Sequence, residues 1–244
     1  MSRENKYTGI VLKKQPFNEG DEIISLFTKE RGKMRVLAKS VKLSGSKMQQ
    51  RLQSLFLLEL TLTAAGALPK IIAAEPIKVF ANLRQSLSAL KASFYALELA
   101  LKFTPDEHKN QALFNLLSGF LEFLDSQNPD RFLNLGLAKF KMEMLQVSGF
   151  GVHHPKDAEI GAKVYFSPLK GGFTSEKPSG SLPVPEETYK IFTAINRADF
   201  SSLAQIPIAE NNLNDLQRLL SMLIEYHLER KVKSEKYLQS GDMV

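Results

Sequence analysis

The sequence predicts an α+β protein in which an N-terminal OB-fold β-barrel precedes a mostly α-helical domain with an irregular insertion. Two observations support this prediction. Short apolar segments between turn-forming residues fill roughly the first third of the chain, and from Phe80 onward apolar residues recur every three or four positions. The chain has 244 residues, 43% of them hydrophobic and 24% charged, which is typical of a folded protein. This length is sufficient to bury a core without disulfides, and the chain contains no Cys.

The first part of the chain is expected to form five short strands. They are Tyr7–Lys14, Glu22–Thr28, Lys33–Ala38, Leu55–Thr63 and Lys70–Pro76. Turn signals separate the first three, at Asn18–Asp21 and at Glu30–Gly32. Five strands of this length indicate a small barrel, and the OB-fold is the five-stranded barrel that binds oligonucleotides. We therefore place a nucleic-acid-binding domain at residues 1–80.

The second part has a helical period. Apolar stripes are expected to bury one face of each helix over the ranges Leu83–Leu101, Leu113–Leu124, Phe132–Leu145 and Leu213–Leu228. Asp106 and Asp130 precede the second and third stripes and are expected to cap those helices. Residues 150–185 contain several Gly and Pro and are expected to be irregular. The helical domain is thus predicted to span 81–244, with this insertion inside it.

Positive charge is concentrated near the N-terminus. Residues 1–80 hold 14 Lys and Arg against 7 Asp and Glu, a net +7, although the whole chain is only +6. Between Lys29 and Arg51 there are eight basic residues and a single acid, Glu30. Such an asymmetry favours a surface for a polyanion such as nucleic acid, and the alternative is a solvated face that aids solubility.

Nine cations are candidates for contact with DNA phosphates. They are Lys13, Lys14, Arg31, Lys33, Arg35, Lys39, Lys42, Lys47 and Arg51. In the third predicted strand, basic and apolar residues alternate, so Lys33 and Arg35 should share one face, with Met34 and Val36 on the other. Single-strand binders also stack bases on aromatic side chains. Phe27 and Phe56 have apolar neighbours and are expected in the core, whereas Phe17 lies in a turn and is the better stacking candidate.

No constellation of residues indicates catalysis. The absence of Cys excludes Cys-ligated zinc, iron–sulfur clusters and thiol nucleophiles. Leu43–Lys47 lacks the spacing of a phosphate-binding loop, and the adjacent pair His153 and His154 lacks the i, i+4 spacing of helical metal ligands. We expect no enzyme activity, no catalytic residues, no metal and no cofactor. Because no segment has the apolar length of a signal peptide or a spanning helix, we expect a cytoplasmic protein without a membrane contact.

Several short motifs follow one another in a defined order along the chain. The N-terminal motifs are Gly9–Leu12, Phe17–Asp21, Leu26–Thr28, Gly32–Lys33, Ala38–Ser40, Ser46–Lys47 and Arg51–Gln53. The C-terminal ones are Phe140–Leu145 with Gly149–Phe150, Tyr165–Pro168 with Gly171–Phe173, and Arg230–Ser234 with Tyr237–Leu238. Their order and spacing over nearly the whole chain resemble the RecO family of bacterial recombination mediators.

The resemblance implies a non-enzymatic role in DNA repair. Members of the family bind single- and double-stranded DNA, anneal complementary strands and, with RecR, help to place RecA on DNA coated by single-strand-binding protein (SSB), which implies a location at the nucleoid. Many carry a four-Cys zinc site near the insertion, and this chain departs from that pattern. The alternatives are an OB-fold RNA-binding module that does not anneal strands, and an enzyme that acts on nucleic acid, which would require a metal cluster or a nucleophile.

The resemblance also implies a site for the acidic C-terminal tail of SSB in the helical domain. Such a tail, which ends in Phe, requires an apolar pocket and a cation for its carboxylate. The third predicted helix has Arg131, Leu135 and Lys139 on one face, with Phe132 one step round. We interpret these four residues as the candidate tail site, and the alternative is that Phe132 and Leu135 belong to the core.

Overall fold

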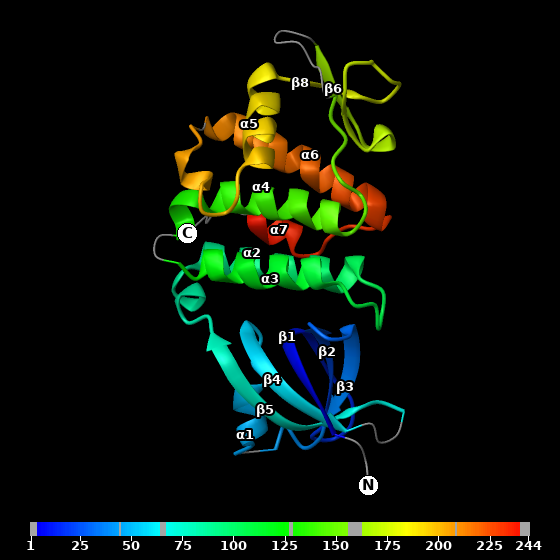
Figure 1. The fold of residues 1–244 in the computed structure, drawn as a ribbon, viewed down its shortest axis with the longest axis vertical. Helices are drawn as coiled ribbons and strands as arrows, with labels where there is room; N and C mark the ends of the chain where they lie inside the picture. Colours follow the sequence, from blue (N-terminus) through cyan, green and yellow to red (C-terminus); the bar gives the residue numbers. More distant parts are fainter. Residues whose placement is uncertain are drawn as a thin grey trace. The chain divides into compact units, whose positions relative to one another are not determined.

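The computed structural model describes residues 4–43, 45–63, 67–126, 129–155, 163–207 and 209–239, without the side chains of residues 129–131 and 239. The chain divides into two compact units, Met1–Asp125 and Ser126–Val244. Figure 1 shows the strands of the barrel in the first unit and the helices α4, α5, α6 and α7 in the second. The α+β fold class predicted from the sequence is confirmed.

Five strands form a closed barrel in the first unit. They are β1 (Glu4–Pro16), β2 (Glu22–Thr28), β3 (Gly32–Ala38), β4 (Phe56–Thr63) and β5 (Lys70–Val79). Their order around the barrel is β1-β2-β3-β5-β4, and every neighbouring pair is antiparallel except β3 and β5. All five strands predicted from the sequence are present. The architecture is that of an OB-like domain.

The long strand β1 closes one side of the barrel. Its first half pairs with β4 and its second half with β2, and the register shifts between Val11 and Lys13. Such a bulge increases the local twist that a small barrel requires. On the opposite side, β3 meets β5 through one register pair, Leu37 with Lys70, and the amide of Leu37 donates to the carbonyl of Pro69 at 2.8 Å.

Alternation along the strands builds the barrel core. Side chains such as Val11, Ile24, Leu26, Met34 and Val36 are almost completely buried in one cluster. Because successive side chains of a strand point to opposite faces, the residues between them face outward. The alternation predicted for the third strand is confirmed, since Met34 and Val36 are buried and Arg35 is exposed.

The first unit continues beyond the barrel. It contains α1 (Lys47–Arg51), the short η1 (Asn82–Gln85), α2 (Leu87–Phe103) and α3 (Gln111–Leu124). The predicted boundary at residue 80 falls just after β5, whereas this compact unit extends to Asp125. The prediction that Asp106 caps α3 is wrong, because the side chain of Asn110 accepts the amide of Leu113 at 2.9 Å in that role.

The second unit is mainly helical. Its helices are α4 (Pro129–Val147), α5 (Glu186–Arg197), α6 (Glu210–Leu228) and α7 (Glu235–Gln239), with short turns η2 (Pro168–Lys170) and η3 (Leu203–Gln205). The insertion forms a three-stranded sheet of β6 (Val164–Ser167), β7 (Gly172–Thr174) and β8 (Leu182–Val184) in the order β7-β6-β8. Among the described residues, no helix combines the length and apolarity needed to cross a membrane.

Aromatic side chains hold the insertion against α5. Phe173 contacts Phe166, Tyr189 and Phe192 with ring centroids 5.2, 5.2 and 4.5 Å apart. The ring of His154 lies 5.6 Å from that of Phe192. Rings at these separations contribute beyond the area that they bury, and so this part of the chain has an apolar core of its own.

The turn between β2 and β3 requires glycine at its last position. Gly32 has a φ of +76°, and a Cβ there would lie 2.0 Å from the carbonyl oxygen of His108. We expect Gly32→Ala to lower the free energy of unfolding by more than about 2 kcal/mol, because backbone strain and a backbone clash add. Gly45→Ala is the matched control, since Gly45 has a φ of +80° and open space around it. Urea titration would measure both, and equal losses would contradict the proposed clash.

Candidate nucleic-acid interface

The nine predicted cations do not form one continuous strip, because those at the start of β3 are held by acidic residues of the same unit. Arg31 pairs with Glu107 at 2.9 Å, and Lys33 pairs with Asp106 at 3.1 Å. The Lys33 ammonium also donates to the carbonyl of Leu101 at 3.1 Å, and its side chain is only 15% exposed. Hydrogen bonding to Glu107 raises the pKa of Arg31.

These pairs fasten the connection between α2 and α3 to the barrel. The amide of Glu107 donates to the carbonyl of Lys33 at 2.7 Å, and Lys33 and Asp106 form an isolated parallel bridge. The positive charges of Arg31 and Lys33 are therefore already balanced within the unit. Lys33, whose side chain is largely buried, is therefore much less available to a phosphate than a free cation would be.

Two of the remaining cations lie in register across the barrel surface. Lys13 on β1 pairs with Ser25 on β2, and Ser25 pairs with Arg35 on β3. Residues directly opposite one another in a sheet share a face, and two strand spacings place the first and third about 10 Å apart. Both cations are exposed while Ser25 between them is buried. Their charged groups thus project from the same face of the sheet.

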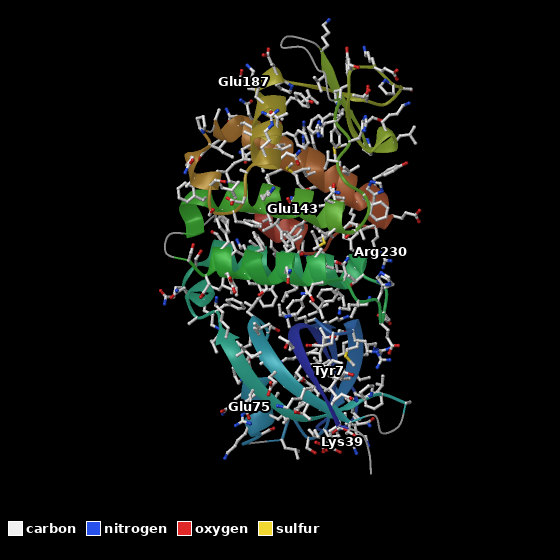
Figure 2. The ribbon with its side chains drawn as sticks, in the orientation of Figure 1. Tyr7, Lys39, Glu75, Glu143, Glu187 and Arg230 are labelled. Carbon is white, nitrogen blue, oxygen red and sulfur yellow. The ribbon has the colours of Figure 1, made fainter. Side chains whose placement is uncertain are left out.

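Lys39 and Lys42 follow β3 in a loop that is bonded to the β1–β2 turn. The amide of Ser40 donates to Asp21 Oδ1 at 2.8 Å, and the amide of Lys42 donates to the carbonyl of Gly20 at 3.0 Å. Both lysines are exposed. Figure 2 shows Lys39 at the end of the barrel opposite α2 and α3. The loop therefore presents these cations from a defined backbone.

The other three cations differ in their surroundings. Lys14 lies in register with the core residues Ile24 and Val36, and burial lowers its pKa against the influence of Glu22. Lys47 is exposed at the start of α1, a short helix that lies outside the helices predicted from the sequence. Arg51, at the end of α1, pairs with Glu75 of β5, which Figure 2 labels.

Five of the nine predicted cations are both exposed and without an ion pair inside the described part of the chain. They are Lys13, Arg35, Lys39, Lys42 and Lys47, which we call the open cations. Three carboxylates, Glu19, Asp21 and Glu22, lie in and beside the β1–β2 turn, next to the loop that carries Lys39 and Lys42. The open cations outnumber these carboxylates, so the surface remains positive and suits a polyanion.

The aromatic residues of the barrel occupy the predicted environments. Phe27 is fully buried with its ring centroid 6.3 Å from that of Phe114, and Phe56 packs against the barrel core. Phe17 is 53% exposed. The two expected core residues are therefore confirmed, and Phe17 is accessible in the turn beside the open cations.

The candidate tail residues lie along α4. Leu135 is buried, and Lys139 is almost buried in an ion pair with Glu143 at 2.7 Å. Phe132 is partly buried, and the side chain of Arg131 lies outside the described residues. The structure thus places Leu135 in the core and gives Lys139 an acidic partner.

A pocket of about 500 Å³, which no sequence pattern indicated, lies between α4, α6 and α7. At its wall the ammonium of Lys141, 1% exposed, donates to Ser221 Oγ at 2.7 Å and to Glu235 Oε1 at 3.1 Å. Burial lowers the pKa of Lys141, although Glu235 opposes this shift. The three residues are far apart in the sequence, so no local pattern indicates their contact.

The residues present do not fit the zinc site that the resemblance would imply. The chain has no Cys, and the described residues contain no group of three or more His, Asp or Glu placed to hold a metal. His154 packs against Phe192, and the amide of His153 donates to the carbonyl of Gly171 at 2.9 Å. The aromatic contacts described above hold the insertion in this chain.

We therefore expect folding and DNA binding to be independent of zinc. Treatment with EDTA should change neither the urea midpoint nor the affinity for single-stranded DNA, because a structural metal would couple its binding energy to folding. Elemental analysis provides the check. One zinc per chain in the purified protein would contradict the expectation.

Comparison with known proteins covers almost the entire chain. A family model described as recombination protein O N terminal matches residues 1–80, and one described as recombination protein O C terminal matches residues 84–236. A DNA repair protein RecO of Dehalococcoides mccartyi is 32% identical over 96% of this chain and 95% of its own length. Proteins of the same name from Desulforamulus reducens and Anaeromyxobacter dehalogenans are 28% and 25% identical, over 96% of this chain in each case and over 93% and 95% of their own lengths.

Proposed function

The chain belongs to the RecO family of DNA repair proteins, and from this membership we propose that it is a non-catalytic, DNA-binding recombination mediator. In this proposal it binds single- and double-stranded DNA, anneals complementary strands and, together with RecR, helps to place RecA on SSB-coated DNA at the nucleoid in the cytoplasm. The observation that supports it most directly is the set of open cations on the surface of an OB-like barrel.

The charge distribution explains how such a surface can promote annealing. Two complementary strands repel one another through their phosphates, and cations that contact both strands reduce this repulsion. Such contacts need donors and positive charge but no base reading, so they act on any sequence. The open cations comprise an Arg and four Lys on strands, a loop and a short helix, which is an arrangement suited to backbone contact.

The experiment that tests the proposal is annealing of complementary strands coated with SSB, at low and at high salt. We expect the protein to accelerate annealing at low salt and to lose this effect as salt rises, because phosphate contacts weaken with salt. Binding without any acceleration would favour the alternative of a plain RNA- or DNA-binding module. Strand cleavage that depends on a divalent ion would favour a nuclease.

We also propose that the second unit binds the acidic tail of SSB along α4. Arg131→Glu combined with Lys139→Gln should weaken binding of a labelled SSB-tail peptide strongly, because the peptide carboxylates lose Arg131 and also Lys139, which in this proposal exchanges its pair with Glu143 for the peptide. Gln is chosen at position 139 because a Glu there would face Glu143. Fluorescence anisotropy would measure peptide and single-strand binding side by side.

The control for the tail experiment is Lys170→Glu with Lys177→Gln, which makes the same charge change at exposed positions of the same unit. This control should retain peptide binding, and both variants should retain binding of bare single strands. Equal loss of both activities in the α4 variant, or unchanged peptide binding, would remove this helix from the tail site.

A further inference from the structure

Two exposed apolar side chains lie at one end of the barrel. One is on the β1–β2 turn and the other is on the loop after β3, which is hydrogen-bonded to that turn. Phe17 is 53% exposed in the β1–β2 turn, and Leu43 is 56% exposed after Lys42. Within the described residues, the Phe17 ring makes no aromatic or cation contact. Large apolar groups in such positions cost free energy by remaining in water, and their grouping therefore favours a binding role.

The two loops hold each other in place. The amide of Phe17 donates to the carbonyl of Asp21 at 3.2 Å, which closes the turn. Gly20 has a φ of +82°, and a Cβ at this position would lie 3.4 Å from Leu43 Cδ2, so Leu43 packs over the turn that displays Phe17. With the bonds from Ser40 and Lys42 already described, these contacts fix the backbone under both side chains.

We propose that Phe17 and Leu43 form a platform on which an unpaired nucleobase stacks while Lys39 and Lys42 contact the adjacent phosphates. This inference rests on the proposed function and assigns to it a base-binding site. Every base has an apolar face that an aromatic ring can cover, so the platform requires no particular sequence. In a duplex that face is covered by neighbouring bases, and the platform therefore favours single strands over double strands.

Lys39 and Lys42, which lie beside the platform together with the turn carboxylates Glu19, Asp21 and Glu22, favour nucleic acid as the occupant. Lys39 and Lys42 flank Ser40 and Val41, and both lysines are exposed. A purely apolar partner would gain nothing from these two cations. A strand of DNA offers an apolar base and an anionic phosphate within one nucleotide, and this pair of chemistries matches the pair on the loops.

Tryptophan at position 17 provides a direct readout, because the chain contains no Trp. In the Phe17→Trp variant, fluorescence should be quenched by an oligothymidine strand and much less by a blunt duplex of the same length. The control is Leu169→Trp, placed at a side chain of the second unit that is 74% exposed. Its emission should be unchanged by both forms of DNA.

Affinity provides a second measurement. Phe17→Ala should weaken single-strand binding by about 5- to 150-fold, the range expected for loss of one stacking contact. The salt dependence should be unchanged because no phosphate contact is lost, duplex affinity should change little, and Phe17→Tyr should retain single-strand affinity.

Two results would overturn the platform while leaving the proposed function intact. One is unchanged Trp emission in a Phe17→Trp protein that still binds the strand with the usual salt dependence. The other is equal quenching by strand and duplex. Failure of the unaltered protein to bind DNA in a salt-dependent manner would instead remove the proposed function, and the platform with it.

Discussion

Replacing Arg35, Lys39 and Lys42 together with alanine is expected to flatten the salt dependence of single-strand binding by about 2, as the slope of log affinity against log salt. Each neutralised phosphate of a single strand contributes about 0.7 to that slope, and three contacts are removed. These three cations are exposed and have no ion pair within the described residues. Binding measured by anisotropy over a range of salt concentrations gives the slope directly.

A matched control removes the same charge elsewhere. Lys170→Ala, Lys177→Ala and Arg197→Ala neutralise three exposed cations of the second unit, and this variant should keep the original slope. Lys33 is left out of the test set because its pairing with Asp106 makes it a structural residue. If the folded triple variant of the barrel retains the full slope, the phosphates are bound elsewhere.

Removing the carboxylate of Glu235 is expected to destabilise the second unit by about 3–5 kcal/mol, because Lys141 would remain buried without its main counter-charge. Lys141→Met combined with Glu235→Leu should recover most of this loss, since an apolar pair needs no counter-charge. Urea unfolding followed by circular dichroism would measure both variants. A Glu235→Ala protein as stable as the parent would show that the pair contributes little.

The pH dependence of the same pair has a defined sign. Burial lowers the pKa of Lys141 from its usual 10.5, so between the two values the unfolded chain binds more protons than the folded one. Stability from this group should rise with pH over the window that ends near 10.5. The loss caused by Glu235→Ala should therefore shrink as pH approaches that value, and a loss that grew with pH would contradict the assignment.

Local patterns were sufficient for the barrel and the longer helices. Period-two alternation and turn residues identified β1 to β5, and the apolar stripe of Leu213–Leu228 identified α6. The sheet of the insertion was missed because β7 and β8 have only three residues each, which is too short for a period to appear. The helix α5 was missed because it follows a segment rich in Gly and Pro.

In the candidate interface, local patterns indicate which side chains face outward but not which of them are paired through tertiary contacts. Alternation placed Arg35 on the outer face, and the structure agrees. Nothing local to Arg31 and Lys33 indicates that Asp106 and Glu107 return to neutralise them from a connection far along the chain. For the same reason, the packing of Leu43 over Gly20 and the burial of Lys141 beside Glu235 depend on tertiary contacts that a one-dimensional pattern does not contain.

The two ends of β3 differ in net positive charge, because the cations at its start are paired with carboxylates and the lysines after it are not. The strand begins at Gly32, beside the paired Arg31 and Lys33, and ends at Ala38, beside the unpaired Lys39. This path is about 20 Å at the usual rise per residue. At physiological salt, fields decay over about 8 Å, so a strand approaching by diffusion senses mainly the nearer end. In the proposed DNA-binding function, encounters near Lys39 and Lys42 are therefore favoured, and we expect the unit to turn toward DNA before any contact forms. The acidic connection between α2 and α3 would thus contribute to the rate of productive encounter without touching the nucleic acid.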